Sequence, residues 1–100
     1  MLPHEIVERG WCQGAGARDV YGNQVASNSV SAVEFCVYGA IWNWAENGGA
    51  TMEKKNELIG QVVNMVPGGY VAGWNDAPVR TRADVISLLK RAERSVGLLS

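Results

Sequence analysis

The chain has 100 residues, of which 47% are apolar and 19% charged, and its formal net charge at pH 7 is −1. This balance excludes an intrinsically disordered chain and predicts a single globular domain over residues 1–100. Nine basic against ten acidic side chains argue against a dedicated nucleic-acid binder, in which a clear basic excess is usual.

The first predicted element is a short helix from His4 to Arg9. Pro3 suits its first turn, where a missing N–H leaves no bond unmade, and Gly10 closes it. The apolar positions Ile6 and Val7 are expected to face the core.

Residues 10–28 are predicted to be irregular or to form a small hairpin. Glycines interrupt this segment repeatedly, and no helical period is visible in it. A turn at Gly22-Asn23, two residues that tolerate positive φ, would be flanked by Val20 and Val25. Two short strands are only marginally stable alone, so such a hairpin would need support from the rest of the fold.

A central helix is predicted near residues 29–46. Ser31 and Glu34 have the spacing of a capping box, in which each side chain accepts one free backbone N–H. Apolar residues recur every three or four positions, at Val33, Val37, Ala40, Ile41 and Trp44. Because the helix is apolar on most sides, it should lie at the centre of the fold.

Two further helices are predicted near residues 52–66 and 80–96, each capped by a threonine at its start. Between them, Tyr70 to Trp74 is predicted to be extended and Asn75 to Pro78 to be a loop. The predicted fold class is therefore mainly α, with three principal helices, a short N-terminal helix and an irregular or hairpin segment.

Two glycines fall inside the predicted helices, Gly39 and Gly60. A glycine in a helix interior is less favourable than alanine by about 1 kcal/mol. We therefore expect another backbone or an indole ring to approach closely at both positions.

The sequence offers little for metal or cofactor chemistry. The single histidine, His4, and the two cysteines, Cys12 and Cys36, lack the paired spacing of a zinc site. Gly14-Ala15-Gly16 begins like a dinucleotide fingerprint but lacks its third glycine. We expect free thiols and no cofactor, with a Cys12–Cys36 bridge as the alternative. A cysteine paired with His4 is the one formal route to a nucleophile.

The densest group of polar and aromatic side chains comprises Trp74, Asn75, Asp76, Arg80 and Arg82. Tryptophan and arginine are enriched at binding hot spots, so a recognition loop is one interpretation. The other is structural: Trp74 packs on the last helix, while Asn75 and Asp76 bond the local backbone in an Asx turn. The sequence favours the structural interpretation and leaves the first open.

Trp42 and Trp44 give a second indication of a binding surface. They lie two positions apart, about 200° around a helix, so both cannot face one core. One of them must lie at a second interface, beneath the N-terminal loop or at the surface. A homodimer contact is one such interface.

Four segments together resemble a known family: Arg9-Gly10-Trp11-Cys12-Gln13-Gly14, Cys36-Val37-Tyr38-Gly39-Ala40-Ile41, Trp74-Asn75-Asp76-Ala77-Pro78 and Arg80-Thr81-Arg82-Ala83-Asp84-Val85. In order and spacing the chain is similar to a family of small uncharacterised proteins, a domain of unknown function seen in actinobacteria and their phages. The resemblance implies no activity. It implies that Trp74, Asn75 and Asp76 form a family signature.

The expected function is that of a non-enzymatic protein-interaction module, with a phage-encoded inhibitor or regulator of a host protein as one version. Its expected partner-binding residues are Trp42, Trp44, Trp74, Asn75, Asp76, Arg80 and Arg82. The alternative is a small nucleic-acid-binding protein, because residues 77–100 carry five basic and two acidic side chains. An enzyme using Cys12 or Asp76 has the least support. With no signal peptide and no apolar run of roughly 20 residues, we expect a cytoplasmic protein without a membrane span.

Overall fold

A computed structural model describes residues 1–100 and shows a mainly α fold, as predicted. Its elements in chain order are α1 (Pro3–Arg9), β1 (Ala17–Arg18), β2 (Glu34–Phe35), α2 (Val37–Trp44), a π-helical turn (Ala45–Gly49), α3 (Met52–Met65), a 3-10 turn (Pro67–Gly69), α4 (Val71–Asp76) and α5 (Arg82–Ser95). None of these helices has both the length and the apolar character needed to cross a membrane.

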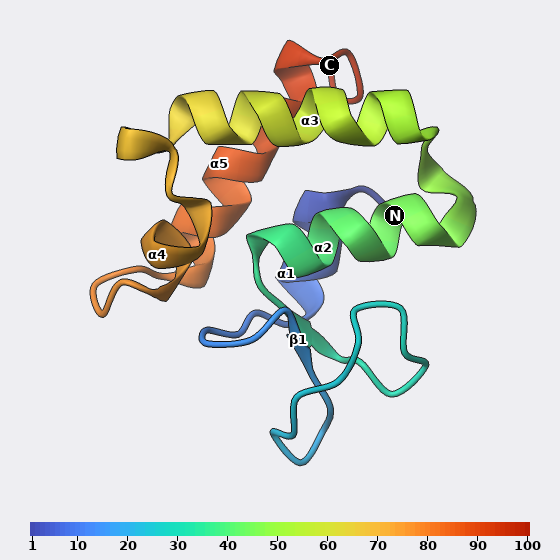
Figure 1. The fold of residues 1–100 in the computed structure, drawn as a ribbon, viewed down its shortest axis with the longest axis vertical. Coiled ribbons are helices and arrows are strands. Elements are labelled where there is room, and N and C mark those ends of the chain that lie inside the picture. Colours follow the sequence, from blue (N-terminus) through green and yellow to red (C-terminus); the bar gives the residue numbers. More distant parts are fainter.

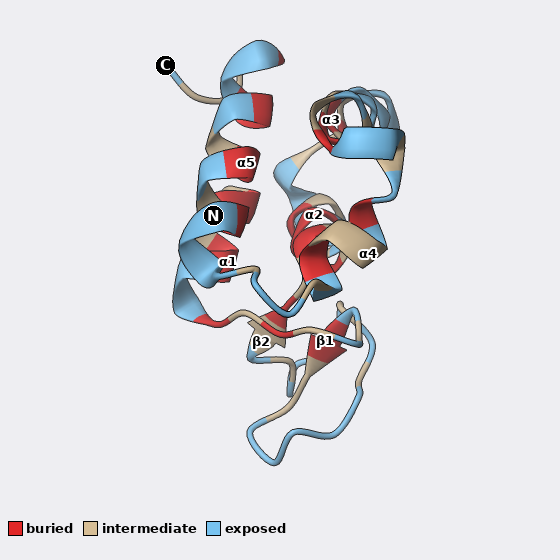
Figure 2. Cartoon of the chain, turned by 90° about the vertical axis from the view of Figure 1, so that its left-hand side faces the viewer, coloured by how far each residue is buried: buried red, intermediate tan, exposed pale blue.

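The helices form two layers, with the strands and a long loop at one end (Figures 1 and 2). One layer holds α1 and α5, and the other holds α2, α3 and α4 (Figure 2). The apolar core lies between the layers and includes Val7, Ile41, Leu58, Leu88 and Leu89, all of which are fully buried.

Three predicted helices are confirmed, because their signals are local. Thr51 accepts a hydrogen bond from the backbone N–H of Lys54 at the start of α3, at 3.1 Å. Thr81 and Asp84 form a reciprocal capping box at the start of α5. The first helix begins at Pro3 and ends before Gly10, as its sequence predicts.

The start of the central helix was predicted wrongly. α2 begins at Val37, with Cys36 as its N-cap, and the capping box expected at Ser31 and Glu34 does not form. Glu34–Phe35 is instead a strand, antiparallel to Ala17–Arg18. The N–H groups around it bond to distant carbonyls, since Val33 donates to Arg18 and Phe35 to Gly10. Those partners lie far away in sequence, so no local signal reveals them.

The predicted turn near Gly22 is confirmed, but Val20 lies within it, and the residues paired across it are Arg18 and Gln24. Asp19 and Asn23 close it, with the Asp19 N–H donating to the Asn23 carbonyl at 3.0 Å, and Gly22 has a φ of +83°. Val25 donates to the carbonyl of Ala17, so both ends of the turn are tied to β1. The support that such a short hairpin needs comes from its pairing with β2.

The segment after α3 was also predicted wrongly. Tyr70 to Trp74 is not extended, and Asn75 is not in a loop, because residues Val71–Asp76 form the short helix α4. Six residues with a central glycine have little intrinsic helical stability. Long-range hydrogen bonds made by Asn75 stabilise this helix, and they are described below.

The two mid-helix glycines have different explanations. A Cβ on Gly39 would overlap the carbonyl of Gly16, so the expected close backbone approach is confirmed there. Gly60 faces open space, and no heavy atom outside its own helix lies within 4 Å of an added Cβ. The same expectation for Gly60 was therefore wrong.

Candidate functional site

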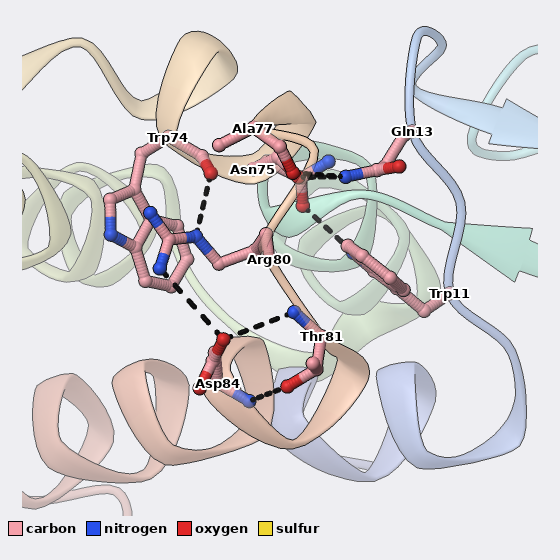
Figure 3. A network of polar contacts seen from close by, with 8 residues as sticks. All are labelled: Trp11, Gln13, Trp74, Asn75, Ala77, Arg80, Thr81 and Asp84. Carbon is pink, nitrogen blue, oxygen red and sulfur yellow. Dashed lines mark hydrogen bonds and ion pairs between the residues drawn. The ribbon is translucent and has the colours of Figure 1, made fainter.

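The side-chain amide of Asn75 joins three segments of the chain, and Figure 3 shows its bond to Trp11. Its Oδ1 accepts from the indole Nε1 of Trp11 at 3.0 Å and from the backbone N of Val37 at 3.2 Å. Its Nδ2 donates to the carbonyl of Cys12 at 3.1 Å and to Oδ1 of Asp76 at 2.9 Å. Both amide atoms are thus fully paired, and Asn75 is only 1% exposed.

Three neighbouring hydrogen bonds extend this connection. Nε2 of Gln13 donates to the carbonyls of Asn75 and Ala77, and the N–H of Gly14 donates to Oδ1 of Asp76. Residues 11–14 are therefore fixed against α4. Asn75 has a structural role here, through long-range bonds and not through the local Asx turn expected, and its burial removes it from any partner surface.

Arg80 lies against Trp74. Its guanidinium stands over the indole at 3.9 Å, its Nε donates to the Trp74 carbonyl at 2.8 Å, and Asp84 lies 3.8 Å from Nη1 (Figure 3). Cation–π and charge-assisted contacts together fix this side chain. Arg80 thereby orders the chain between α4 and α5 and is less available to a ligand than Arg82.

A groove of about 890 Å³ lies between the adjacent ends of α1 and α5 and the segments that form β1, β2 and the long loop. We call it the basal groove; it is lined by residues that include Arg9, Trp11, Asp19, Val20, Val33, Glu34, Arg80 and Arg82. Arg9 ends α1 and Arg82 begins α5, and the two helices run antiparallel, because His4 lies beside Glu93 and Glu8 beside Arg82. The sequence placed Arg80 and Arg82 in a candidate site but missed Arg9.

A second hollow of about 440 Å³ adjoins the groove and shares Arg9 and Val33 with it. We call it the apolar pocket; its other lining residues include Met1, Ile6, Asn28, Val30, Ala32, Phe35, Asn43 and Asn47. Ile6 and Phe35 are buried, so they form its floor. No sequence signal pointed to this pocket, because residues from three segments build it.

The long loop between β1 and β2 presents apolar side chains to solvent. Val20, Tyr21, Val30 and Val33 are 73%, 85%, 106% and 40% exposed, and we call them the loop face. Val33 links them, since it lines the basal groove with Val20 and the apolar pocket with Val30. Isolated apolar residues in a segment rich in Gly, Ser and Asn were the available signal for this surface.

The two tryptophans of α2 face opposite ways, as their spacing requires. Trp44 is 4% exposed and belongs to the core, whereas Trp42 is 40% exposed. Nζ of Lys55 stands 3.7 Å above the Trp42 ring, so this indole already has a partner within the chain. No hollow is lined by Trp74 together with Trp42 or Trp44, and the burial of Trp44 keeps it from a partner.

The cysteines are free thiols, and the alternative Cys12–Cys36 bridge does not form. Cys12 is buried, and burial raises its pKa to about 11. Cys36 is half-buried at the N-cap of α2, and burial raises the pKa of this thiol too, against hydrogen bonds from the helix N–H groups. Both thiols are protonated at neutral pH, which does not favour a nucleophile.

The only histidine contacts an acid, not a cysteine. His4 Nδ1 lies 2.5 Å from Oε1 of Glu93, and the His4 N–H donates to Oε2 of Glu93 at 2.9 Å. Glu93 is fully buried, and burial raises its pKa above the ordinary carboxyl value. The pair joins α1 to α5 within the core. No group of three or more His, Cys, Asp and Glu side chains is placed to hold a metal ion.

Comparison with known proteins identifies the family and nothing beyond it. The chain belongs to DUF6197, a family of unknown function, whose match covers residues 4–95. No curated protein and no solved structure matches the chain.

Proposed function

We propose that this chain is a non-enzymatic module that binds another protein through the loop face. The observation that carries the proposal is a set of exposed apolar side chains on the long loop, of which Val20, Val30 and Val33 line two adjoining hollows and Tyr21 follows Val20 in the chain. Single exposed apolar residues are ordinary, but several of them on one loop beside adjoining hollows are typical of an interaction site.

The loop that carries these side chains is held by hydrogen bonds at several points. Nη1 and Nη2 of Arg18 donate to the carbonyls of Gly22 and Gln13, and Nδ2 of Asn43 donates to the carbonyl of Ser27 at 2.8 Å. An ordered loop loses less conformational entropy on binding than a mobile one. The apolar surface is therefore preorganised, which supports a binding role.

The expected site changes accordingly. Of the residues proposed from the sequence, Arg80 and Arg82 line the basal groove. Trp74 contacts Arg80, whereas Asp76 lines a separate, smaller hollow. The strongest support now comes from the loop, which the sequence did not single out.

Nucleic-acid binding is the alternative and has less support. Arg80 is engaged by Trp74 and Asp84, and Nε of Arg94 donates to the Ser100 carbonyl. The basal groove mixes its arginines with the acids Asp19 and Glu34, so it offers no continuous basic track for a run of phosphates.

Two finer points belong to the proposal. The two free cysteines support a cytoplasmic location, where thiols stay reduced. A phage-encoded inhibitor of a host protein is one version, supported by the resemblance of the four segments to a family seen in actinobacteria and their phages.

A pull-down with matched surface variants tests the proposal. The loop variant is Tyr21→Ser with Val30→Ser, and the control is Tyr70→Ser with Val79→Ser, whose side chains are comparably exposed elsewhere. Captured proteins are identified by mass spectrometry and titrated, once purified, against each variant. We expect the loop variant to bind about tenfold or more weakly, as for loss of a hot spot, and the control to bind like the wild type.

Equal binding by the loop variant and the wild type would contradict the proposal. So would a captured protein that is lost after nuclease treatment, because a nucleic acid would then link it to this chain. Light scattering on the same proteins tests self-association. A wild-type dimer that the loop variant makes monomeric would identify the partner as a second copy of the chain.

A further inference from the structure

We propose that the basal groove and the apolar pocket together bind one extended segment of the partner, in which carboxylates lie near an apolar side chain. This inference rests on the proposed protein-binding function and specifies the chemistry of the partner. Three observations support it: the continuity of the two hollows, the unpaired arginines and the free amide oxygens beside the apolar floor.

The two hollows are continuous because Arg9 and Val33 line both of them. Val33 stands between the hollows and is 40% exposed, so a chain that passes over it enters both. An extended chain advances about 3.3 Å per residue and points alternate side chains to opposite faces. Residues a few positions apart can therefore reach the two hollows from one backbone.

The charges that lack partners in the groove are mainly basic. Arg9 makes no side-chain hydrogen bond or ion pair, and Arg82 makes only a 3.4 Å hydrogen bond to the carbonyl of Glu8. By contrast, Oδ1 of Asp19 accepts the N–H groups of Tyr21 and Asn23 within its own turn. Glu34 is thus the one acid in the groove whose carboxylate accepts no hydrogen bond.

Arg82 also stands where helix electrostatics disfavour it. It is the first residue of α5, and the N-terminus of a helix carries partial positive charge. A cation there has little local stabilisation beyond that from the acidic residue of the capping box. Residues that break a local rule are often functional, and carboxylates from a partner would satisfy both Arg82 and Arg9.

The apolar pocket supplies the second half of the recognition. Its floor, Ile6 and Phe35, suits an aliphatic side chain of the partner. At its rim, Nδ2 of Asn43 and Nδ2 of Asn47 donate to carbonyls of this chain, whereas their Oδ1 atoms accept nothing. Those two oxygens can accept backbone N–H groups from an extended segment.

Fluorescence polarisation with four labelled octapeptides tests the inference. The probe peptide has one leucine and two glutamates in a glycine–serine background. Its two glutamates stand two positions apart. The others replace the glutamates by glutamines, the glutamates by lysines, or the leucine by alanine. We expect the probe to bind tightest and to weaken with added salt, because partly exposed ion pairs are screened.

Two charge-matched variants locate the binding site. The groove variant is Arg9→Gln with Arg82→Gln, and the control is Arg91→Gln with Arg94→Gln on α5. Partly exposed ion pairs are weak individually, so the groove variant should bind the probe about fivefold to tenfold more weakly. The control, with the same change of net charge, should bind like the wild type.

Equal binding of the glutamate and glutamine peptides overturns the inference, and so does a probe peptide that does not bind. An equal loss of affinity in the groove variant and in its control overturns it as well. The captured partner separates this failure from that of the protein-binding proposal. If its binding requires Tyr21 and Val30 but not Arg9 and Arg82, only the acidic-segment inference fails. If no captured protein depends on the loop face, both fail.

Discussion

Asn75 gives the sharpest test of how this fold is held together. Truncation to alanine leaves the N–H of Val37, the carbonyl of Cys12 and the indole N–H of Trp11 without a partner. A buried polar group that loses its partner costs about 1–3 kcal/mol. Trp11 is half-buried and can regain water, so its share is small.

We therefore expect Asn75→Ala to lower the free energy of unfolding by about 3–5 kcal/mol, a large part of the total of about 5–15 kcal/mol for a domain. Asn75→Asp keeps the shape but places a carboxylate oxygen against the oxygens of Cys12 and Asp76. It should destabilise at least as much, although it leaves no cavity.

Urea unfolding followed by tryptophan fluorescence measures both variants. Asn64→Ala is the matched control, because Asn64 is exposed on α3 and makes no side-chain hydrogen bond, so its effect should stay within about 0.5 kcal/mol. If both Asn75 variants lose less than about 1 kcal/mol, the hydrogen bonds of Asn75 do not stabilise the fold and the reasoning is refuted.

Further predictions concern the helix glycines, the buried acid and a thiol. Gly39→Ala should destabilise the fold because its Cβ would overlap the Gly16 carbonyl, whereas Gly60→Ala should stabilise the fold by up to about 1 kcal/mol. Urea unfolding measures both variants, and equal changes in the free energy of unfolding would disprove the packing argument. Burial raises the pKa of Glu93, so the folded state holds this proton more tightly than the unfolded state does. The stability of the wild type relative to Glu93→Gln should thus be greatest below the ordinary carboxyl pKa and fall as pH rises through the raised pKa; a flat difference between pH ~4 and ~8 would contradict this. Cys12, with a pKa of about 11, should react with iodoacetamide at pH 7 far more slowly than in urea-unfolded protein, and equal rates would show that it is accessible.

The sequence predicted those elements whose signals are local. Thr51 and the 3.6-residue period located α3, and Thr81 with Asp84 located the start of α5. The spacing of Trp42 and Trp44 also predicted correctly that only one of them could be buried. Helix caps and apolar periodicity involve residues three or four positions apart, so they can be recognised in the sequence alone.

The candidate site could be predicted only in part. Arg80 and Arg82 stood out because they lie in a segment dense in polar and aromatic side chains. Nothing in the sequence around Arg9 or Val33 indicated that these two residues line the same groove as the two arginines. Trp74 and Asn75 stood out as well, yet their partners, not their neighbours, determine that they act structurally.

The amino-acid sequence by itself therefore determined the mainly helical fold class and the positions of α1, α3 and α5. It also determined that only one of Trp42 and Trp44 could be buried. Only the tertiary structure decided that residues 34–35 form a strand, that residues 71–76 form a helix, and that Asn75 joins this helix to Trp11 and to the start of α2. These outcomes depend on hydrogen bonds between segments as many as 64 positions apart. Where intrinsic helix propensity is weak, such long-range bonds decide the local conformation.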